Sequence, residues 1–360
     1  MTDLRNEKAD MDMIDFKSLE AELHDRLRRI DRWRRVVRAL SVVVYLLVFA
    51  WLLFVLLGGM VLARLGWEDY DMLPRVIVPV FIGLVLLSFL LSYSLITFQN
   101  QECAAMRSVM QALFPQVSFS FSSEVDSGLL AGSRLFTASY GDPALGVDGY
   151  GEIELGYGND RLHVADVGIS YGWMNRWQAH PVLGYVVFVY RFVLRPVFAW
   201  RSESSAHNFR GMFGWCRTER RYEGDILVLP DHLEDKTGYL AGNIQALRKR
   251  FNTRLVKLED PEFERRFVVY ADSEVAARMV LTPAMMRRMS ELRDAMGRDL
   301  MFSFSKGNFY YAASMPEGFL RLRPGRLQEG KMLERLYKDI SLACRVADEL
   351  RVNKLFADKA

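Results

Sequence analysis

The most chemically suggestive residues of this chain form a dense run of carboxylates. They are Glu259, Asp260, Glu262 and Glu264. Carboxylate oxygens at this density could hold a divalent cation if further oxygen ligands converged on them from elsewhere in the fold. In the alternative interpretation, which we favour, Arg265 and Arg266 join these carboxylates in a solvated turn. Phe263 and Phe267 would then anchor that turn in the core.

The five histidines do not form a pattern typical of a hydrolase or a zinc site. They are His24, His163, His180, His207 and His232. None belongs to an HExxH motif, and no two stand four residues apart. The chain also lacks the GxGxxG, Walker A and GxSxG motifs, and the glycine pairs at 149–151 and 156–158 fit tight turns better than a phosphate site. The sequence therefore predicts no catalytic, cofactor-binding or metal-binding residue.

Charge and cysteine content narrow the range of partners. The 360 residues carry a formal net charge of +3, which gives no argument for nucleic-acid binding, and we expect no nucleic-acid partner. The three cysteines, Cys103, Cys216 and Cys344, lie far apart without a CxxC spacing. This usage fits a reducing compartment and excludes a disulfide framework or a cysteine-rich zinc site.

Two long apolar runs are the strongest structural signal in the sequence. They cover Ser41 to Ala63 and Val76 to Phe98, and neither contains a charged side chain. Each exceeds the roughly 20 apolar residues that cross a hydrocarbon core of about 30 Å. The sequence therefore predicts a membrane α-helical hairpin over residues 39–98, with transmembrane spans at 41–63 and 76–98.

Arginines crowd the segment before the first run. They are Arg26, Arg28, Arg29, Arg32, Arg34, Arg35 and Arg38. The loop between the runs holds only Arg64 and Arg75 beside acidic residues. The positive-inside rule then places the N-terminus in the cytoplasm, and two crossings return the C-terminus to the same side. A cleaved secretory signal is a poor alternative, because the first run begins only at Ser41 and a second run follows at once.

The pattern of residues 1–38 predicts a cytoplasmic, amphipathic, arginine-rich helix that leads into the first run. Its apolar stripe repeats at spacings of three and four: Leu19, Leu23, Leu27, Ile30, Trp33 and Val37. In the favoured interpretation the basic faces lie near anionic phospholipid headgroups. The alternative is a coiled-coil seam that forms a homo-oligomer, although fewer than four clean heptads are present.

A third apolar stretch, Pro181 to Trp200, offers a helix of only about 15 residues, or about 22 Å, which is too short to cross a membrane. Pro181 can begin a helix, and Pro196 should end it. Two arginines at bilayer depth would also be costly. We interpret this apolar insertion, 173–200, as an amphipathic segment in the lipid interface, with a buried core helix as the alternative. The candidate lipid-interface residues are Trp173, Arg176, Trp177, Arg191, Arg195, Trp200 and Arg201.

The remaining sequence predicts a cytoplasmic α+β domain with antiparallel strands over 99–326 and a C-terminal helix within 327–360. The turn residues Gly158-Asn159-Asp160 and Lys306-Gly307-Asn308 each predict a β-hairpin between flanking β-rich segments. Thr282-Pro283 is an N-cap followed by proline, which indicates the start of a helix. The further strands and helices are expected at Asp225 to Leu229, Phe267 to Tyr270, Pro283 to Gly297 and Leu327 to Asn353.

Four segments of the chain resemble a known family. They are Phe209-Arg210-Gly211-Met212-Phe213, Ile226 to Asp231, Leu255 to Tyr270 and Ala276 to Pro283. They resemble the bacterial domain-of-unknown-function family 3137 (DUF3137), sometimes labelled galanin-like, and the likeness extends from the apolar runs to about Ala312. The resemblance implies a two-helix membrane protein with a cytoplasmic domain, and it brings no established catalytic residues.

These features favour a non-enzymatic binding or scaffold protein that is anchored in the bacterial inner (cytoplasmic) membrane. It would be a multi-pass protein with both termini in the cytoplasm. The expected partners are the lipid bilayer, including anionic phospholipid, and an unidentified protein, and no cofactor is expected. The alternatives are a membrane-bound enzyme with an unrecognised active site and a lipid-surface-binding module. Titratable side chains that converge in a deep pocket would favour the enzyme.

Overall fold

The chain folds into two compact units, each described here by itself. The computed structural model describes residues 16–64, 72–136, 145–157, 160–171, 177, 180, 183–184, 187, 208–218, 224–231, 254–316, 318–320 and 332–350. The first unit consists mainly of residues up to Arg107 and is helical. The second unit begins at Ser108 and contains all the strands.

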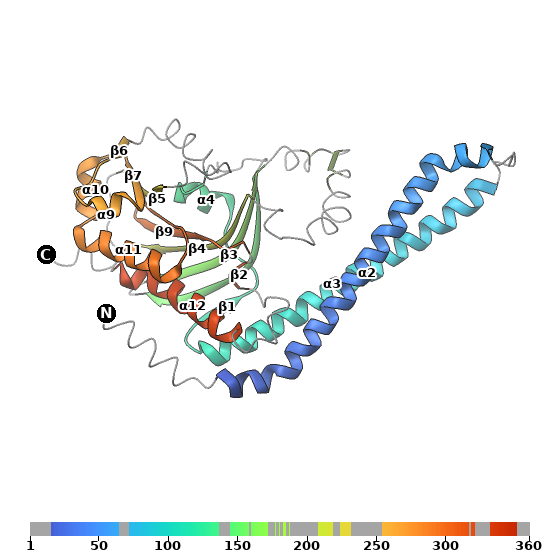
Figure 1. The fold of residues 1–360 in the computed structure, drawn as a ribbon, viewed down its shortest axis with the longest axis horizontal. Coiled ribbons are helices and arrows are strands. Elements are labelled where there is room, and N and C mark those ends of the chain that lie inside the picture. The colour runs from blue at the N-terminus through green and yellow to red at the C-terminus, as the bar shows by residue number, and fades with distance from the viewer. Residues whose placement is uncertain are drawn as a thin grey trace. The chain divides into compact units, whose positions relative to one another are not determined.

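The helical unit is built from two long helices, α2 (Phe16–Arg64) and α3 (Met72–Leu113), the last residues of α3 belonging to the second unit. The two helices run side by side (Figure 1). Trp51 of α2 contacts Phe81 of α3 with ring centroids 5.2 Å apart. Both predicted apolar runs therefore lie in helices. Ile30, Val37 and Val44 of α2 and Leu91 of α3 are among the described side chains that are buried.

The two helices differ in how well their length and composition fit a membrane span. Among the described residues, Arg28–Val55 is the stretch long and apolar enough to cross a membrane, whereas the apolar part of α3, Ile77–Leu91, is shorter. The structure thus contains one candidate apolar helix near the N-terminus. The second span, and with it the membrane hairpin, stays a prediction. Of the residues in the predicted stripe, Ile30 and Val37 are buried, whereas Trp33 is 44% exposed.

The second unit is organised around one nine-stranded sheet. Its strand order is β1-β2-β3-β4-β9-β8-β5-β7-β6, and every neighbouring pair is antiparallel. The strands are β1 (Ser118–Ser120), β2 (Leu145–Tyr157), β3 (Asp160–Tyr171), β4 (Phe209–Arg217), β5 (Ile226–Pro230), β6 (Arg254–Val256), β7 (Phe267–Ala271), β8 (Leu300–Ser305) and β9 (Asn308–Ser314). The expectation of antiparallel strands is therefore confirmed.

Both predicted hairpins are present. In the first, Tyr157 pairs with Asp160 across the turn between β2 and β3. In the second, Phe304 pairs with Phe309, and the intervening Lys306 and Gly307 both have positive φ, 50° and 78°. Two consecutive residues with positive φ form the turn whose twist matches that of antiparallel strands.

Helices cover both faces of the sheet (Figure 1). They are α4 (Ser127–Ser133), α9 (Pro261–Glu264), α10 (Glu274–Val280), α11 (Pro283–Met296) and α12 (Met332–Glu349). Adjacent strand residues point to opposite faces. In β9 the hydroxyl of Tyr310 lies near Gly132 of α4, whereas the hydroxyl of Tyr311 donates to the carbonyl of Ala343 in α12 at 2.7 Å. The helices α4 and α12 therefore lie on opposite faces.

Local sequence signals fix the helix ends as expected. Thr282 caps α11 by accepting a hydrogen bond from the Met285 amide, and Gly297 ends the helix in the left-handed conformation. The described C-terminal helix is shorter than predicted, since residues after Leu350 lie outside the described part. Sequence reasoning made no strand prediction for Phe209–Arg217, which forms the interior strand β4 between β3 and β9.

Candidate functional site

The acidic run at 259–264 forms a structural turn, in agreement with the favoured interpretation. Asp260 caps α9 by accepting hydrogen bonds from the amides of Glu262 and Phe263. Glu264 accepts from the Leu258 amide at 2.7 Å. Phe263 and Phe267 are each only 1% exposed. Two of the four carboxylates, those of Asp260 and Glu264, therefore hold the backbone of the turn, while Glu259 and Glu262 pair with arginines at the surface.

The predicted lipid-interface residues fall almost entirely outside the described part of the chain. Trp177 is the exception, and its side chain is 39% exposed. Its carbonyl accepts a hydrogen bond from the His180 amide at 3.0 Å. Trp173, Arg176, Arg191, Arg195, Trp200 and Arg201 are not described. The interface interpretation of 173–200 stays a prediction.

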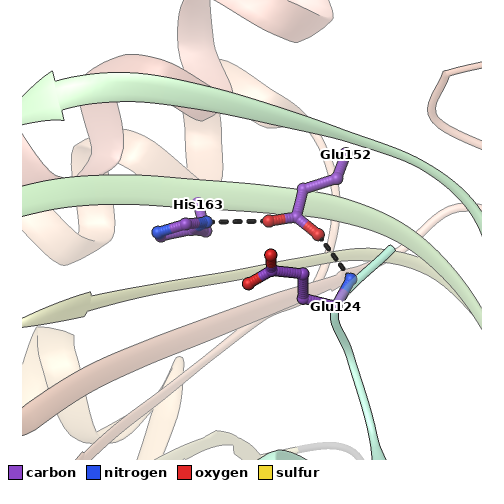
Figure 2. Close-up of side chains that lie close together, drawn as sticks. All are labelled: Glu124, Glu152 and His163. Carbon is purple, nitrogen blue, oxygen red and sulfur yellow. Dashed lines mark hydrogen bonds and ion pairs between the residues drawn. The ribbon is translucent and has the colours of Figure 1, made fainter. Parts of the chain in front are cut away.

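The structure brings together a different set of side chains, Glu124, Glu152 and His163, here called the Glu-Glu-His cluster. Glu124 lies in the loop before α4, Glu152 in β2 and His163 in β3 (Figure 2). One ligand atom from each residue lies within 4.8 Å of the others.

Local backbone features place the three residues. The pairing of β2 with β3 sets Glu154 opposite His163 and Glu152 opposite Ala165. The side chains of Glu152, Glu154 and His163 therefore share one face of the sheet. The loop with Glu124 approaches β2 at Gly149, where an added Cβ would lie 2.6 Å from Ser123. Gly149 thus lies in a bulged strand and permits this approach, rather than forming the tight turn that the sequence suggested.

Hydrogen bonds lock Glu152 at the centre of the cluster. Its Oε1 lies 2.7 Å from Nδ1 of His163, and its Oε2 accepts the Glu124 amide at 2.7 Å (Figure 2). Glu152 is 5% exposed, His163 is half-buried, and Glu124 is exposed. The Trp215 ring stacks on His163 with centroids 5.0 Å apart and an interplanar angle of 10°. The cluster is therefore buried at Glu152 and exposed to solvent at Glu124.

The electrostatics of the cluster favour positive charge. The hydrogen bond to Glu152 is the largest cause of a raised pKa at His163, and the nearby charges of Glu152, Glu154 and Glu124 act in the same direction. Partial burial opposes them but does not cancel the shift. Glu154 forms an ion pair with Arg161. The carboxylates of Glu124 and Glu152 therefore dominate the local field.

A second polar group is buried in the sheet and has a structural role. Arg210 of β4 binds Asp166 of β3 through both guanidinium nitrogens, the Nη2 to Oδ2 distance being 2.9 Å. Asp166 also accepts the Leu320 amide at 3.1 Å, and the Arg210 guanidinium lies 3.7 Å from the Tyr150 ring centroid. Through this contact, the pair connects the backbone at Leu320, after β9, to the sheet.

The fold defines a class of protein: an antiparallel sheet unit covered by helices, in one chain with two long apolar helices. Residues 207–352 match the model of the family described as "Protein of unknown function (DUF3137)". The predicted resemblance is confirmed there, and the match continues beyond Ala312 through α12. The two apolar runs lie outside the matched range.

Other comparisons add little. No curated protein matches the chain. Among solved structures, the crystal structure of the mycobacterial trehalose monomycolate transport factor A, TtfA, aligns with 11% identity and a TM-score of 0.35. The alignment covers 69% of this chain and 93% of that one. At this TM-score the likeness carries no argument about fold or function.

Sequence reasoning missed the Glu-Glu-His cluster, although part of the signal was present. The predicted hairpin between β2 and β3 already sets Glu154 opposite His163, and Glu152 is then the diagonal neighbour. The approach of Glu124, 28 residues before Glu152, depends on how the preceding loop packs. No spacing rule reveals that contact.

Proposed function

We propose that the chain is a membrane-anchored binding or scaffold protein with its sheet unit in the cytoplasm. The observation that carries the proposal is the apolar outer surface of α2 and α3. Leu46 of α2 is 63% exposed, and Phe89 of α3 is 70% exposed. Further exposed side chains on the two helices are Val43, Leu47, Phe49, Val78, Phe81, Ile82, Leu86 and Leu90. So many exposed apolar side chains on two helices are costly in water and suit contact with lipid.

The backbone and polar groups of the two helices are compatible with a lipid environment. Hydroxyl groups in the apolar runs donate to carbonyls four residues earlier, from Ser41 to Val37, from Ser94 to Leu90 and from Thr97 to Tyr93. Groups satisfied within their own helix need no water. These contacts support insertion of both runs.

The arginines before the first apolar run support a cytoplasmic N-terminus. Arg28, Arg29, Arg32 and Arg35 are exposed on α2 just before the first apolar run. Basic residues next to a span favour the cytoplasmic side and attract anionic phospholipid. Two crossings then return residues 99–360 to the cytoplasm. The resemblance to the family and this charge asymmetry support a bacterial inner membrane as the location.

Binding is favoured over catalysis by the use of the buried charged groups. Within the described residues, three of the four buried charged side chains are held in arginine–carboxylate pairs: Asp166 and Arg210 pair with each other, and Asp225 pairs with Arg134, whereas the fourth, Glu152, belongs to the Glu-Glu-His cluster. Charged groups that are held in such pairs stabilise the fold and leave little capacity for acid-base chemistry. The alternative function, a lipid-surface-binding module, would require residues 173–200 to bind the membrane interface.

A topology measurement tests the anchor. A reporter enzyme that is active only outside the cytoplasm is fused after Ala360 in one variant and inserted at Glu68 in another. The proposal predicts a silent fusion at Ala360 and an active insertion at Glu68, with both proteins resistant to alkaline extraction from membranes. An active fusion after Ala360, or release of the protein by alkali, would contradict the anchor model.

A second measurement tests the binding role. The tagged chain is solubilised from membranes after crosslinking, and the proteins that co-purify are compared with those of a variant lacking residues 108–360. A partner that requires the sheet unit supports a scaffold. Recovery of the same proteins with both chains would show that the helices alone account for the association.

A further inference from the structure

The charge balance of the Glu-Glu-His cluster is incomplete. Two carboxylates face one imidazole, and the neighbouring Glu154 is already paired with Arg161. Even a fully protonated His163 leaves one negative charge in the cluster. Glu152 is almost completely buried, so water screens it poorly. A cation with two positive charges would neutralise the site when the imidazole is neutral.

We propose that Glu124, Glu152 and His163 bind one divalent transition-metal ion, through one oxygen of each carboxylate and Nδ1 of the imidazole. The three ligands come from three segments, and their side chains point toward one another (Figure 2). The site lies in the sheet unit and is independent of the membrane anchor.

The distances are compatible with a shared ion. Transition metals such as zinc bind imidazole nitrogen and carboxylate oxygen at about 2.0–2.2 Å, so two ligand atoms on one ion lie roughly 3–4 Å apart. In the cluster, Nδ1 of His163 and Oε1 of Glu152 are 2.7 Å apart, and all three ligand atoms lie within 4.8 Å. Small side-chain movements, mainly of the exposed Glu124, would therefore complete the site.

The ligand types select the class of metal. One nitrogen and two oxygens suit zinc, manganese or a similar first-row ion, whereas calcium and magnesium prefer oxygen ligands alone. Glu152 already has the second contact that orients a metal ligand, since its Oε2 accepts the Glu124 amide. Trp215, stacked on His163, orients the imidazole from the other side. The exposed side at Glu124 leaves room for water as a further ligand.

The direct test is calorimetric titration of the full-length, detergent-solubilised protein with Zn²⁺ after treatment with a chelator, with Mg²⁺ as the control ion. We expect one tight Zn²⁺ equivalent that depends on the cluster and weak binding of Mg²⁺. Loss of even an outer partner of a metal ligand costs roughly 10- to 100-fold in affinity. Glu124→Gln and His163→Gln should therefore each weaken Zn²⁺ binding by at least about tenfold.

Glu154→Gln is the matched control, because it removes a neighbouring carboxylate without removing a ligand. It should change the affinity by no more than about fivefold. Glu124 is exposed, so its replacement should leave the fold intact, which a thermal melt can verify. If the wild-type protein takes up no Zn²⁺, or if Glu124→Gln and His163→Gln bind it as tightly as wild type, the proposal is wrong.

Fluorescence locates the bound ion. Co²⁺ at His163 should quench Trp215, which stacks on that ring at 5.0 Å. Because the chain has seven tryptophans, the comparison is with Trp215→Phe, in which the quenched component should disappear. Undiminished quenching in Trp215→Phe would place the ion elsewhere and overturn the assignment.

Discussion

At the scale of single residues, burial separates two arginine–carboxylate pairs that look alike in sequence. Arg210 and Asp166 are almost completely buried, whereas the Arg161 side chain, which pairs with Glu154, is 67% exposed. Removing one partner of a buried pair leaves an uncompensated charge, while an exposed pair contributes little. The same chemistry therefore has different consequences at the two positions.

Arg210→Met should lower the free energy of unfolding by about 3–5 kcal/mol, because it leaves Asp166 buried without its cation. Arg161→Met is the matched control and should cost less than about 1 kcal/mol. Chemical unfolding of the solubilised chain, followed by tryptophan fluorescence, measures both. Equal effects of the two changes would contradict the structural role assigned to the buried pair.

The phenol of Tyr311 links stability to alkaline pH. Complete burial raises its pKa well above the ordinary value of 10.0, so the folded protein retains the proton that the unfolded chain loses. The resulting stability is fully present below about pH 10 and is lost as pH rises from there toward the folded pKa. We expect the thermal midpoint to fall steeply above pH 10.

Tyr311→Phe provides the comparison for this pH dependence. It loses the hydrogen bond to Ala343 at 2.7 Å and should be less stable at neutral pH by about 1 kcal/mol. Its thermal midpoint should then fall less steeply between pH 10 and 11.5 than that of wild type, because one buried phenol is absent. Parallel curves for the two proteins would show that other groups control alkaline unfolding.

At the scale of elements, β4 is where the sheet tolerates least change. Its residues Phe209 and Phe213 enter the core beside Phe136. An added Cβ at Gly214 would fall on the Tyr311 ring, and one at Gly211 would fall on the backbone of β9. Gly211, which lies in the segment that resembles the family, and the following Gly214 are therefore required by close packing between neighbouring strands and side chains.

Gly214→Ala should destabilise the sheet unit by about 2–3 kcal/mol, because the new methyl group displaces the buried Tyr311 ring. Gly156→Ala in β2 is the control, since nothing lies within 4 Å of its added Cβ, and it should change stability by no more than about 0.5 kcal/mol. Thermal melts of both variants test the prediction. A Gly214→Ala protein as stable as wild type would mean that the packing around Tyr311 is looser than the structure shows.

At the scale of the whole molecule, the chain combines an apolar helical unit with a sheet unit that has its own core. The segment Trp173 to Trp200 lies almost entirely outside the described residues. The segment is predicted to lie in the lipid interface. The arginines within it, Arg191 and Arg195, would reach anionic phosphates while the aromatic side chains stay near headgroup depth.

A fragment from Gln99 to Ala360 retains every residue of the sheet unit and should bind anionic vesicles, with weaker binding at higher salt. Changing Arg191 and Arg195 to Glu should reduce vesicle binding about tenfold or more, since each basic residue contributes roughly 1 kcal/mol. Arg265→Glu with Arg287→Glu, at exposed positions, makes the same charge change as a control. Sedimentation with vesicles measures the binding, and a melt confirms that each fragment folds. Equal loss in both double variants would point to overall charge instead of this segment.

The sequence by itself determined the local elements, because their signals lie within a few residues. The glycine turn at Lys306-Gly307, the Thr282 cap and the two apolar runs each follow from short-range sterics, hydrogen bonding or hydropathy. Only the tertiary structure decided the position of β4 between β3 and β9 and the convergence of Glu152, His163 and the loop of Glu124. Those arrangements depend on strand order and on contacts between residues far apart in the chain, for which no local rule exists. The acidic run at 259–264 forms the turn that the sequence favoured, whereas the candidate metal ligands come from three segments that no motif connects.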